Sequence, residues 1–403
     1  MGKTQIRCLF LALCLAGLIP AVGIAAPPGN AGTASAPAPA SALQGYLRQG
    51  IDKAFNLELA AATALFQKAV ELDRDNPLGY AFMALGHLFD YELSFDLQKR
   101  IRDQEAMLMA VGEALARGQA RVERNPRDGQ AYFAMAIAKI VKIRWAIAQK
   151  RYFIVAQETT YTWDYLLRAR AEDPQNFDIY FPIGLLHYHL DHLAGAARFF
   201  SSLLITTGDN QKGLQELALA AQKGVLMKEL AQAELSSVYT YYEGLPSLAL
   251  AFTLELKEKY PNNYNFSLSL ANILAEIGRF DEAFAIAREI EKGIASGRPP
   301  FVPQLQPRYD HLMGRILFNQ RDYGRAAEFF EKALKDTSIY NARIRTSALV
   351  RLGMIQDARG NRKQAQEYYN RALVVDGGEG FGQVEAKRYL KTPYAPRPKD
   401  PAP

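Results

Sequence analysis

Hydrophobic positions between Gln44 and Lys391 recur at intervals of three and four residues. Such spacing places apolar side chains on one face of an α-helix, whereas alternation at every second residue would indicate a β-strand. Good helix formers (Ala, Leu, Glu, Lys, Arg and Gln) dominate this stretch, and runs of alternating β-branched residues are scarce. The pattern therefore predicts an all-α protein.

A finer pattern occurs twice between Arg308 and Val374. A glycine is followed after 12 residues by alanine, after 16 by an aromatic residue and after 19 by alanine again. The first copy consists of Gly314, Ala326, Phe330 and Ala333, and the second of Gly353, Ala365, Tyr369 and Ala372. Small residues let two helices approach closely, and the ring fills the remaining space. Each copy thus predicts a helix–turn–helix unit.

This order of residues resembles the tetratricopeptide repeat, which has a period of about 34 residues. The resemblance implies a right-handed α-solenoid in which each unit buries its apolar face against the next. Earlier, less regular copies contain Gly184, Ala196 and Phe200, then Ser237 and Ala249, and then Ala271 and Ala283. Near the start, Ala62, Phe66 and Ala69 are typical of the second helix of a pair.

The chain is expected to contain five segments. We predict a signal peptide at residues 1–25, an Ala- and Pro-rich flexible linker at 26–42 and an irregular helical region with degenerate repeats at 43–175. The tetratricopeptide-like repeats follow at 176–391, and a Pro-rich disordered tail at 392–403. The solenoid is therefore expected to be irregular in its N-terminal half, where some predicted helices are too long for the repeat.

The N-terminal segment has the anatomy of a secretory signal peptide. Lys3 and Arg7 precede an unbroken apolar run at residues 8–19, and small residues follow, so cleavage is expected after Ala25. The run is shorter than the roughly 20 apolar residues that a spanning helix needs. We therefore expect export to a bacterial periplasm. A membrane anchor made by an uncleaved N-terminal segment is the alternative.

The sequence offers no convincing catalytic or metal site. Both cysteines, Cys8 and Cys14, fall within the predicted signal peptide, so the mature chain would have no disulfide or thiolate. Three of the five histidines are His187, His189 and His192. Helical zinc motifs place two histidines four residues apart, which this cluster does not, so we interpret it as ordinary helix-end histidines. No enzyme activity, metal or cofactor is expected.

The concave groove formed by the first helices of the pairs is the expected binding site. The resemblance implies that certain positions of these helices face inward. Those positions hold Phe181, Tyr188 and His189, then Tyr241 and Tyr242, then Asn265 and Asn272, and finally Arg308, His311, Arg315 and Phe318. Aromatic and arginine side chains are common in binding hot spots. An asparagine amide would suit the backbone of an extended peptide. Packing between neighbouring helices is the alternative role of the aromatic residues.

A second aromatic group lies in the irregular half. It comprises Tyr152, Phe153, Tyr161, Trp163 and Tyr165. Such a group would suit a binding surface, but a core between two long helices is the simpler interpretation.

The charge adds a weak indication of partners. The chain carries a net charge of +6, and from Ile339 to the end twelve Lys and Arg residues face six Asp and Glu residues. This excess would suit acidic lipid head groups, and hence peripheral membrane association, or an acidic partner. Scattered charges are more often a solvated helix face. Nucleic acid is not an expected partner, because no nucleic-acid-binding module is found.

Together these features predict a non-enzymatic adaptor or scaffold of the cell envelope. It would bind a peptide or protein segment in the concave groove of its solenoid. The competing hypothesis is an envelope enzyme or glycan-binding protein with a site in the irregular half near Trp163 and His187.

Overall fold

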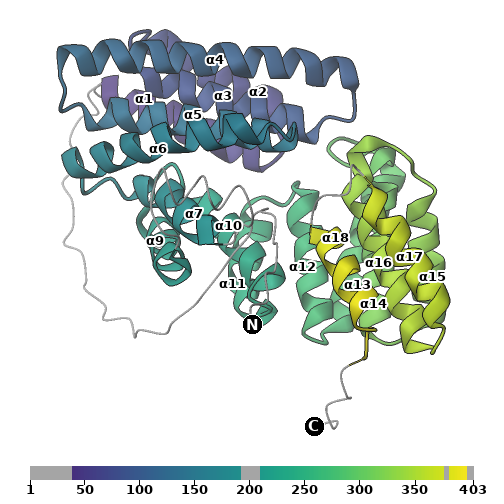
Figure 1. The fold of residues 1–403 in the computed structure, drawn as a ribbon. Coiled ribbons are helices and arrows are strands. Elements are labelled where there is room, and N and C mark those ends of the chain that lie inside the picture. The colour runs from purple at the N-terminus through teal and green to yellow at the C-terminus, as the bar shows by residue number, and fades with distance from the viewer. Residues whose placement is uncertain (1–38, 192–208, 376–380, 397–403) are drawn as a thin grey trace, which may run out of the picture. The chain divides into compact units, whose positions relative to one another are not determined.

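The computed structural model describes residues 39–191, 209–375 and 381–396. Within these ranges all regular secondary structure is helical (Figure 1). The described residues divide into two units. The N-terminal unit comprises residues 39–186 and 211–235, and the C-terminal unit comprises residues 187–191, 209–210, 236–375 and 381–396. The predicted signal peptide and most of the predicted linker lie outside the described residues.

The first part of the chain contains the longest helices together with shorter ones. They are α1 (Pro39–Phe55), α2 (Leu59–Leu72), α3 (Pro77–Leu93), α4 (Leu97–Arg124), α5 (Gly129–Ala148), α6 (Tyr152–Glu172), the 3₁₀ helix η1 (Phe177–Ile179), α7 (Tyr180–Asp191) and α9 (Asn210–Lys223). Helix α4 has 28 residues and α6 has 21, whereas α14 and α15 have 14 and 12. The N-terminal half is therefore irregular, as its sequence predicts.

The later helices have at most 17 residues each. They are α10 (Lys228–Tyr241), α11 (Pro246–Lys259), α12 (Tyr264–Glu276), α13 (Phe280–Ser296), η2 (Pro303–Leu305), α14 (Gln306–Asn319), α15 (Tyr323–Leu334), η3 (Ile339–Asn341), α16 (Ala342–Ala358), α17 (Arg362–Val374) and α18 (Phe381–Lys391). Helix α12 packs against α13, α14 against α15, and α16 against α17. The first helices α12, α14 and α16 also contact each other in order, which is the arrangement of an α-solenoid.

The repeated sequence pattern marks where paired helices touch. A Cβ atom on Gly314 would lie 2.7 Å from the Phe330 ring, and one on Gly353 would overlap the Tyr369 ring. The alanines of both copies are fully buried, as are the earlier ones that the structure describes: Ala249, Ala271, Ala283, Ala326, Ala333, Ala365 and Ala372. The glycines therefore allow each aromatic ring to lie directly against the backbone of the partner helix.

The same pattern also occurs at the start of the folded chain. Counted from Gly50, Ala62, Phe66 and Ala69 lie at the same intervals of 12, 16 and 19 residues. A Cβ atom on Gly50 would overlap the Phe66 ring, and this ring also covers Gly86 of α3. Helices α1 and α2 are thus a regular pair, of which Ala62, Phe66 and Ala69 by themselves predicted only the second helix.

Gly184 packs differently from the glycines of the regular pairs. A Cβ atom there would lie 2.7 Å from Leu217 and 2.8 Å from the carbonyl oxygen of Gly213, both in α9. Its predicted partners Ala196 and Phe200 lie outside the described residues. Helix α9 is therefore the neighbour that Gly184 accommodates.

The predicted segment boundaries differ from the structure at three places. Helix α1 begins at Pro39, within the predicted linker. The N-terminal unit continues past residue 175 to residue 186, because η1 is bonded to the chain before α10. Tyr394, in the predicted solvated tail, is partly buried against the core of the C-terminal unit.

Candidate partner-binding groove

Three of the predicted groove residues, together with Glu276, contact one another across successive first helices of the C-terminal unit. The Arg315 guanidinium of α14 bonds to a Glu276 carboxylate oxygen of α12 at 2.7 Å. It also lies 5.9 Å from the centre of the Tyr241 ring at the end of α10. The Asn272 amide nitrogen of α12 donates to the Tyr241 hydroxyl at 3.2 Å. These contacts form one polar row across three repeats.

Asn272 is the most deeply buried polar group in this row. Its side chain is 3% exposed, and its amide oxygen has no hydrogen-bond partner among the described residues. A buried amide oxygen without a partner costs free energy, so a ligand N–H that reached it would be favourable. Tyr241, by contrast, is 36% exposed. The row therefore combines an accessible aromatic ring with a buried amide.

Neighbouring charges and burial set the protonation states of the groups in and beside the row. Burial alone would raise the pKa of Glu276, but the charges of Arg315 and Arg351 outweigh it, and its pKa is lowered. Burial lowers the pKa of His311 well below its ordinary value, and the same two arginines lower it further. His311 is thus neutral at physiological pH, and its Nε2 is 2.8 Å from the Ser347 hydroxyl. Two guanidinium groups therefore lie near one carboxylate and one neutral imidazole.

The other groove residues of α12 and α14 are engaged within the protein. Arg308 donates to the Asn341 amide oxygen at 3.2 Å. The Asn265 N–H is bonded to the Asn263 side chain at the start of α12. Phe318 is 6% exposed, and its ring lies 5.4 Å from that of Tyr323. These residues contact other parts of the protein and do not offer a large free surface to a partner.

Tyr188, His189 and Tyr242 form an aromatic cluster. The ring centres of Tyr188 and His189 lie 5.2 Å apart, and that of His189 lies 6.0 Å from that of Tyr242. The Tyr188 hydroxyl bonds to the Glu243 carboxylate at 2.6 Å. Tyr188 and His189 are buried, so their visible role is packing, the alternative that the sequence left open. Phe181, in the N-terminal unit, is buried as well.

Comparison with known proteins agrees with the helix pairs and their spacing. A family model described as tetratricopeptide repeat matches residues 311–335 and 346–376. These ranges coincide with the two clearest copies of the pattern. Residues 311–335 and 346–376 are therefore tetratricopeptide repeats.

Several solved structures are similar to this chain at low sequence identity. TTC0263, a tetratricopeptide repeat protein from Thermus thermophilus, is 21% identical, with 58% of this chain and 99% of that chain covered and a TM-score of 0.35. A tetratricopeptide repeat protein from Parabacteroides merdae is 15% identical, with 81% and 99% covered and a TM-score of 0.32. Human IFIT1, solved as a dimer with m7Gppp-AAAA, is 19% identical, with 78% and 67% covered and a TM-score of 0.39. No curated protein matches.

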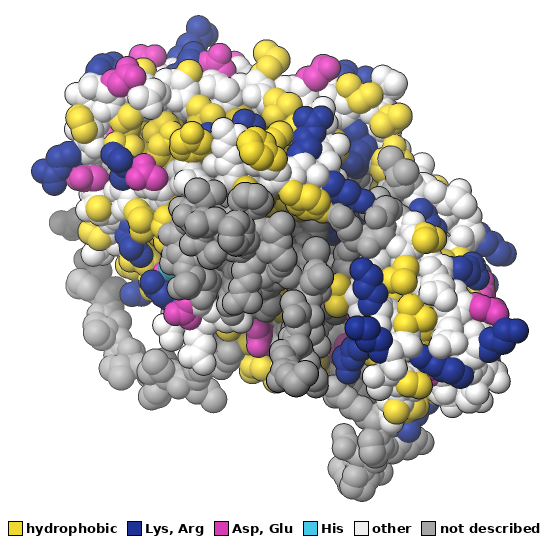
Figure 2. Space-filling view, in the orientation of Figure 1, with side chains coloured by type: hydrophobic (Ala, Val, Ile, Leu, Met, Phe, Trp, Pro, Cys, Tyr) yellow, Lys and Arg dark blue, Asp and Glu magenta, His cyan; other side chains and the backbone are white. Residues whose placement is uncertain are grey.

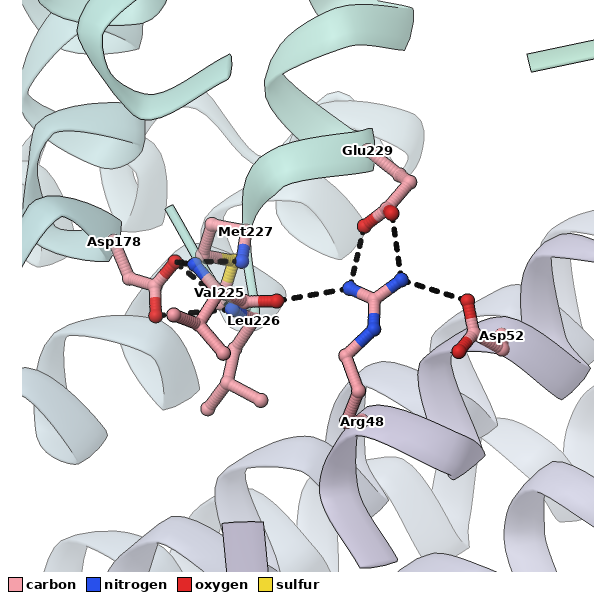
Figure 3. A network of polar contacts seen from close by, with 7 residues as sticks. All are labelled: Arg48, Asp52, Asp178, Val225, Leu226, Met227 and Glu229. Atoms are coloured by element: carbon pink, nitrogen blue, oxygen red, sulfur yellow. Dashed lines mark hydrogen bonds and ion pairs between the residues drawn. The ribbon is translucent and has the colours of Figure 1, made fainter. Parts of the chain in front are cut away.

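A polar network that the sequence did not predict lies in the N-terminal unit (Figure 3). Asp178 of η1 accepts the N–H groups of Val225, Leu226 and Met227 at 2.7 to 3.0 Å. These residues directly precede α10, so the carboxylate acts as a helix cap supplied from 47 residues or more upstream. Burial raises the pKa of Asp178, although the three N–H groups oppose the shift.

Arg48 of α1 completes this network. It bonds to both carboxylate oxygens of Glu229 at 2.5 and 2.6 Å, to Asp52 at 2.7 Å and to the Val225 carbonyl at 2.9 Å. Glu229 is 2% exposed, so this bidentate pair is buried on the acidic side. No local sequence signal links residues 181 positions apart.

The structure divides the aromatic group of α6, because Trp163 and Tyr165 are half-buried whereas the other three residues are exposed. Phe153 is 82% exposed, and Tyr152 and Tyr161 are each 49% exposed. For Tyr152, Phe153 and Tyr161 the prediction of a core was wrong, since α6 packs mainly against α5. Figure 2 shows hydrophobic side chains among basic ones over the surface of the N-terminal unit.

The structure describes two of the three clustered histidines. His187 and His189 are buried, and His192 lies outside the described residues. Among the residues that the structure describes, no three metal-binding side chains come together. In the same part of the chain, no helix is both long and apolar enough to cross a membrane.

Proposed function

We propose that this tetratricopeptide repeat protein is an exported, non-enzymatic scaffold of the bacterial envelope that binds an extended peptide segment. Its repeat fold supports a role in protein–protein interaction in general. The single observation that carries the finer proposal is the polar row of Tyr241, Asn272, Glu276 and Arg315. It crosses three repeats and contains an unmatched buried amide oxygen.

A peptide backbone suits this row for a chemical reason. An extended segment presents N–H groups at regular spacing, and the Asn272 oxygen needs one donor. Tyr241 supplies exposed ring surface beside it, and Arg315 supplies a charge that a peptide carbonyl or carboxylate can share with Glu276. The envelope setting rests on the predicted signal peptide and on the cysteine-free mature chain.

The test is recovery of partners from envelope extracts by purified chain. The double variant Tyr241→Ala/Arg315→Ala is expected to lower the recovery of any groove ligand at least tenfold. The reason is that it removes both the exposed ring and the guanidinium of the row. The matched control is Tyr368→Ala/Arg371→Ala on α17. It removes an equivalent pair, in which the guanidinium lies 5.3 Å from the ring, away from the row. Equal recovery by the two double variants would sink the groove proposal.

The exposed aromatic face of α6 favours a second candidate function, glycan binding through stacking on Phe153 and Tyr161. Thermal-shift measurements against envelope glycans separate the two. A shift that Phe153→Ala abolishes would favour this candidate, and no shift with any glycan would remove it.

A further inference from the structure

The segment after α18 returns to the C-terminal unit and packs on it. The Tyr394 ring lies 5.9 Å from the Phe318 ring of α14 and 5.7 Å, edge to face, from the Tyr389 ring of α18. Phe318 belongs to the first helix of its pair and is one of the predicted groove residues. The segment therefore crosses from α18 back to a helix that belongs to the groove.

The backbone of this segment is held as well as its side chain. The Tyr394 N–H donates to the Asp357 carboxylate at 2.9 Å. The Asp357 side chain is 1% exposed and also accepts from Arg362 and from the Tyr369 hydroxyl. Arg362 in turn bonds to the carbonyls of Tyr389 and Leu390 at 2.8 and 2.7 Å. Asp357 is therefore a fixed acceptor, oriented by its own repeat before the segment arrives.

We call the site formed by Phe318, Tyr323, Arg351, Asp357 and Tyr389 the Tyr394 pocket. The Arg351 guanidinium lies 5.3 Å from the Phe318 ring, at the pocket wall. Burial and the neighbouring Tyr323 raise the pKa of Tyr394 to about 12, so its phenol is neutral when docked. The pocket thus combines aromatic walls, a cation and one acceptor for a backbone N–H.

The sequence of the segment suits docking at low entropic cost. Pro393 and Pro396 flank Tyr394, and proline restricts the chain to extended conformations before binding. A preorganised extended segment with one aromatic anchor loses little conformational freedom on docking. The pocket therefore recognises a tyrosine next to proline whose backbone N–H is available to donate to Asp357.

We propose that the Tyr394 pocket is a docking site for tyrosine–proline segments. Residues 392–396 are its resident, intramolecular ligand, and a partner segment of the same chemistry enters by displacing them. This docking site extends the proposed function, since residues 392–396 cover Phe318 of α14, which is one of the predicted groove residues. It does not depend on the row at Arg315, and it is testable with the chain's own sequence.

The test supplies the tail as a labelled peptide covering residues 392–403 to the full chain. In the Tyr394→Ala chain the resident anchor is missing, so the peptide is expected to bind at least tenfold more tightly than to the wild-type chain. In the wild-type chain the tethered tail competes at a high effective concentration. Binding is followed by fluorescence anisotropy, and matching melting temperatures establish that both chains are folded.

Two controls keep the result specific. A peptide with the Tyr394→Ala change is expected not to bind, and the Phe318→Ala/Tyr394→Ala chain is expected to lose the gained affinity. Equal binding to wild-type and Tyr394→Ala chains, or equal binding of both peptides, would overturn the proposal. A wild-type chain that forms dimers only while Tyr394 is present would overturn its intramolecular part, since the tails would then be exchanged between copies.

These outcomes are separable from the test of the groove. Failure to recover an envelope partner leaves the peptide measurement unchanged. Failure of the peptide to bind leaves the row at Tyr241, Asn272 and Arg315 untouched.

Discussion

Single small residues decide how closely the paired helices approach. At Gly314 the missing Cβ atom leaves space for the Phe330 ring, and the same holds for Gly353 with Tyr369 and for Gly50 with Phe66. Close-packed interiors cannot absorb extra atoms at such contacts without moving a helix. The repeat pattern therefore identifies residues at which paired helices touch, and each contact can be tested by a single substitution.

Gly314→Leu is expected to lower the free energy of unfolding by on the order of 1–3 kcal/mol through overpacking. Gly324→Leu is the matched control, because the nearest heavy atom to a Cβ there is 3.8 Å away. Thermal and denaturant unfolding measure both. An unchanged melting temperature for Gly314→Leu would argue against the register of helix pairing. Gly50→Leu extends the test to the pair α1 and α2.

At the scale of an element, the start of α10 is unusual because its cap is not local. Helix α4 is capped by Asp96, which accepts the N–H groups of the two residues Gln98 and Lys99 just beyond it. Helix α10 instead depends on Asp178, with Arg48 holding Glu229 in its first turn. Three segments far apart in sequence must therefore assemble before this helix end is satisfied.

Asp178→Ala is expected to destabilise the N-terminal unit by roughly 1–3 kcal/mol, because buried N–H groups lose their acceptor. Hydrogen exchange should speed up at the amides of Val225, Leu226 and Met227. Asp96→Ala is the control: it removes a local, exposed cap worth about 1 kcal/mol and should leave those amides unchanged. Slow exchange at residues 225–227 in Asp178→Ala would show that other groups satisfy them.

At the scale of the whole molecule, basic side chains predominate on the visible face of the C-terminal unit (Figure 2). The twelve Lys and Arg residues from Ile339 onward include Arg345, Arg351 and Arg362, which bond to or pack on the protein itself. Part of the basic excess is thus structural. Lys387 and Lys391 of α18 are exposed, and they would suit the acidic partner or lipid head groups that the charge balance suggests.

Export is the other whole-molecule prediction. N-terminal sequencing of chain recovered from the periplasm of a suitable bacterial host is expected to begin at Ala26. Ala25→Arg should block cleavage, because the peptidase needs a small residue there, and should leave the chain with the membrane fraction. Recovery of the wild-type chain with an intact N-terminus would instead support the uncleaved anchor.

The sequence by itself determined the part of the fold that depends on local periodicity, namely the helices and the contacts within helix pairs. Spacing of three and four residues specifies helices, and the intervals from Gly314 and Gly353 specify which faces of a pair meet. Applied to Gly50, the same intervals would have predicted the first pair as well. Several candidate groove residues also followed from this register, including Tyr241, Asn272 and Arg315, which the structure brings together.

Only the tertiary structure decided which distant segments become neighbours. Asp178 accepts hydrogen bonds from the chain before α10, Arg48 bonds to Glu229 and the Tyr394 ring packs on Phe318. None of these pairs lies within one repeat. It also decided that Phe153 is exposed, whereas Tyr188 and His189 are buried. Periodicity states that a face is apolar or polar, but the element that covers it depends on packing summed over the chain.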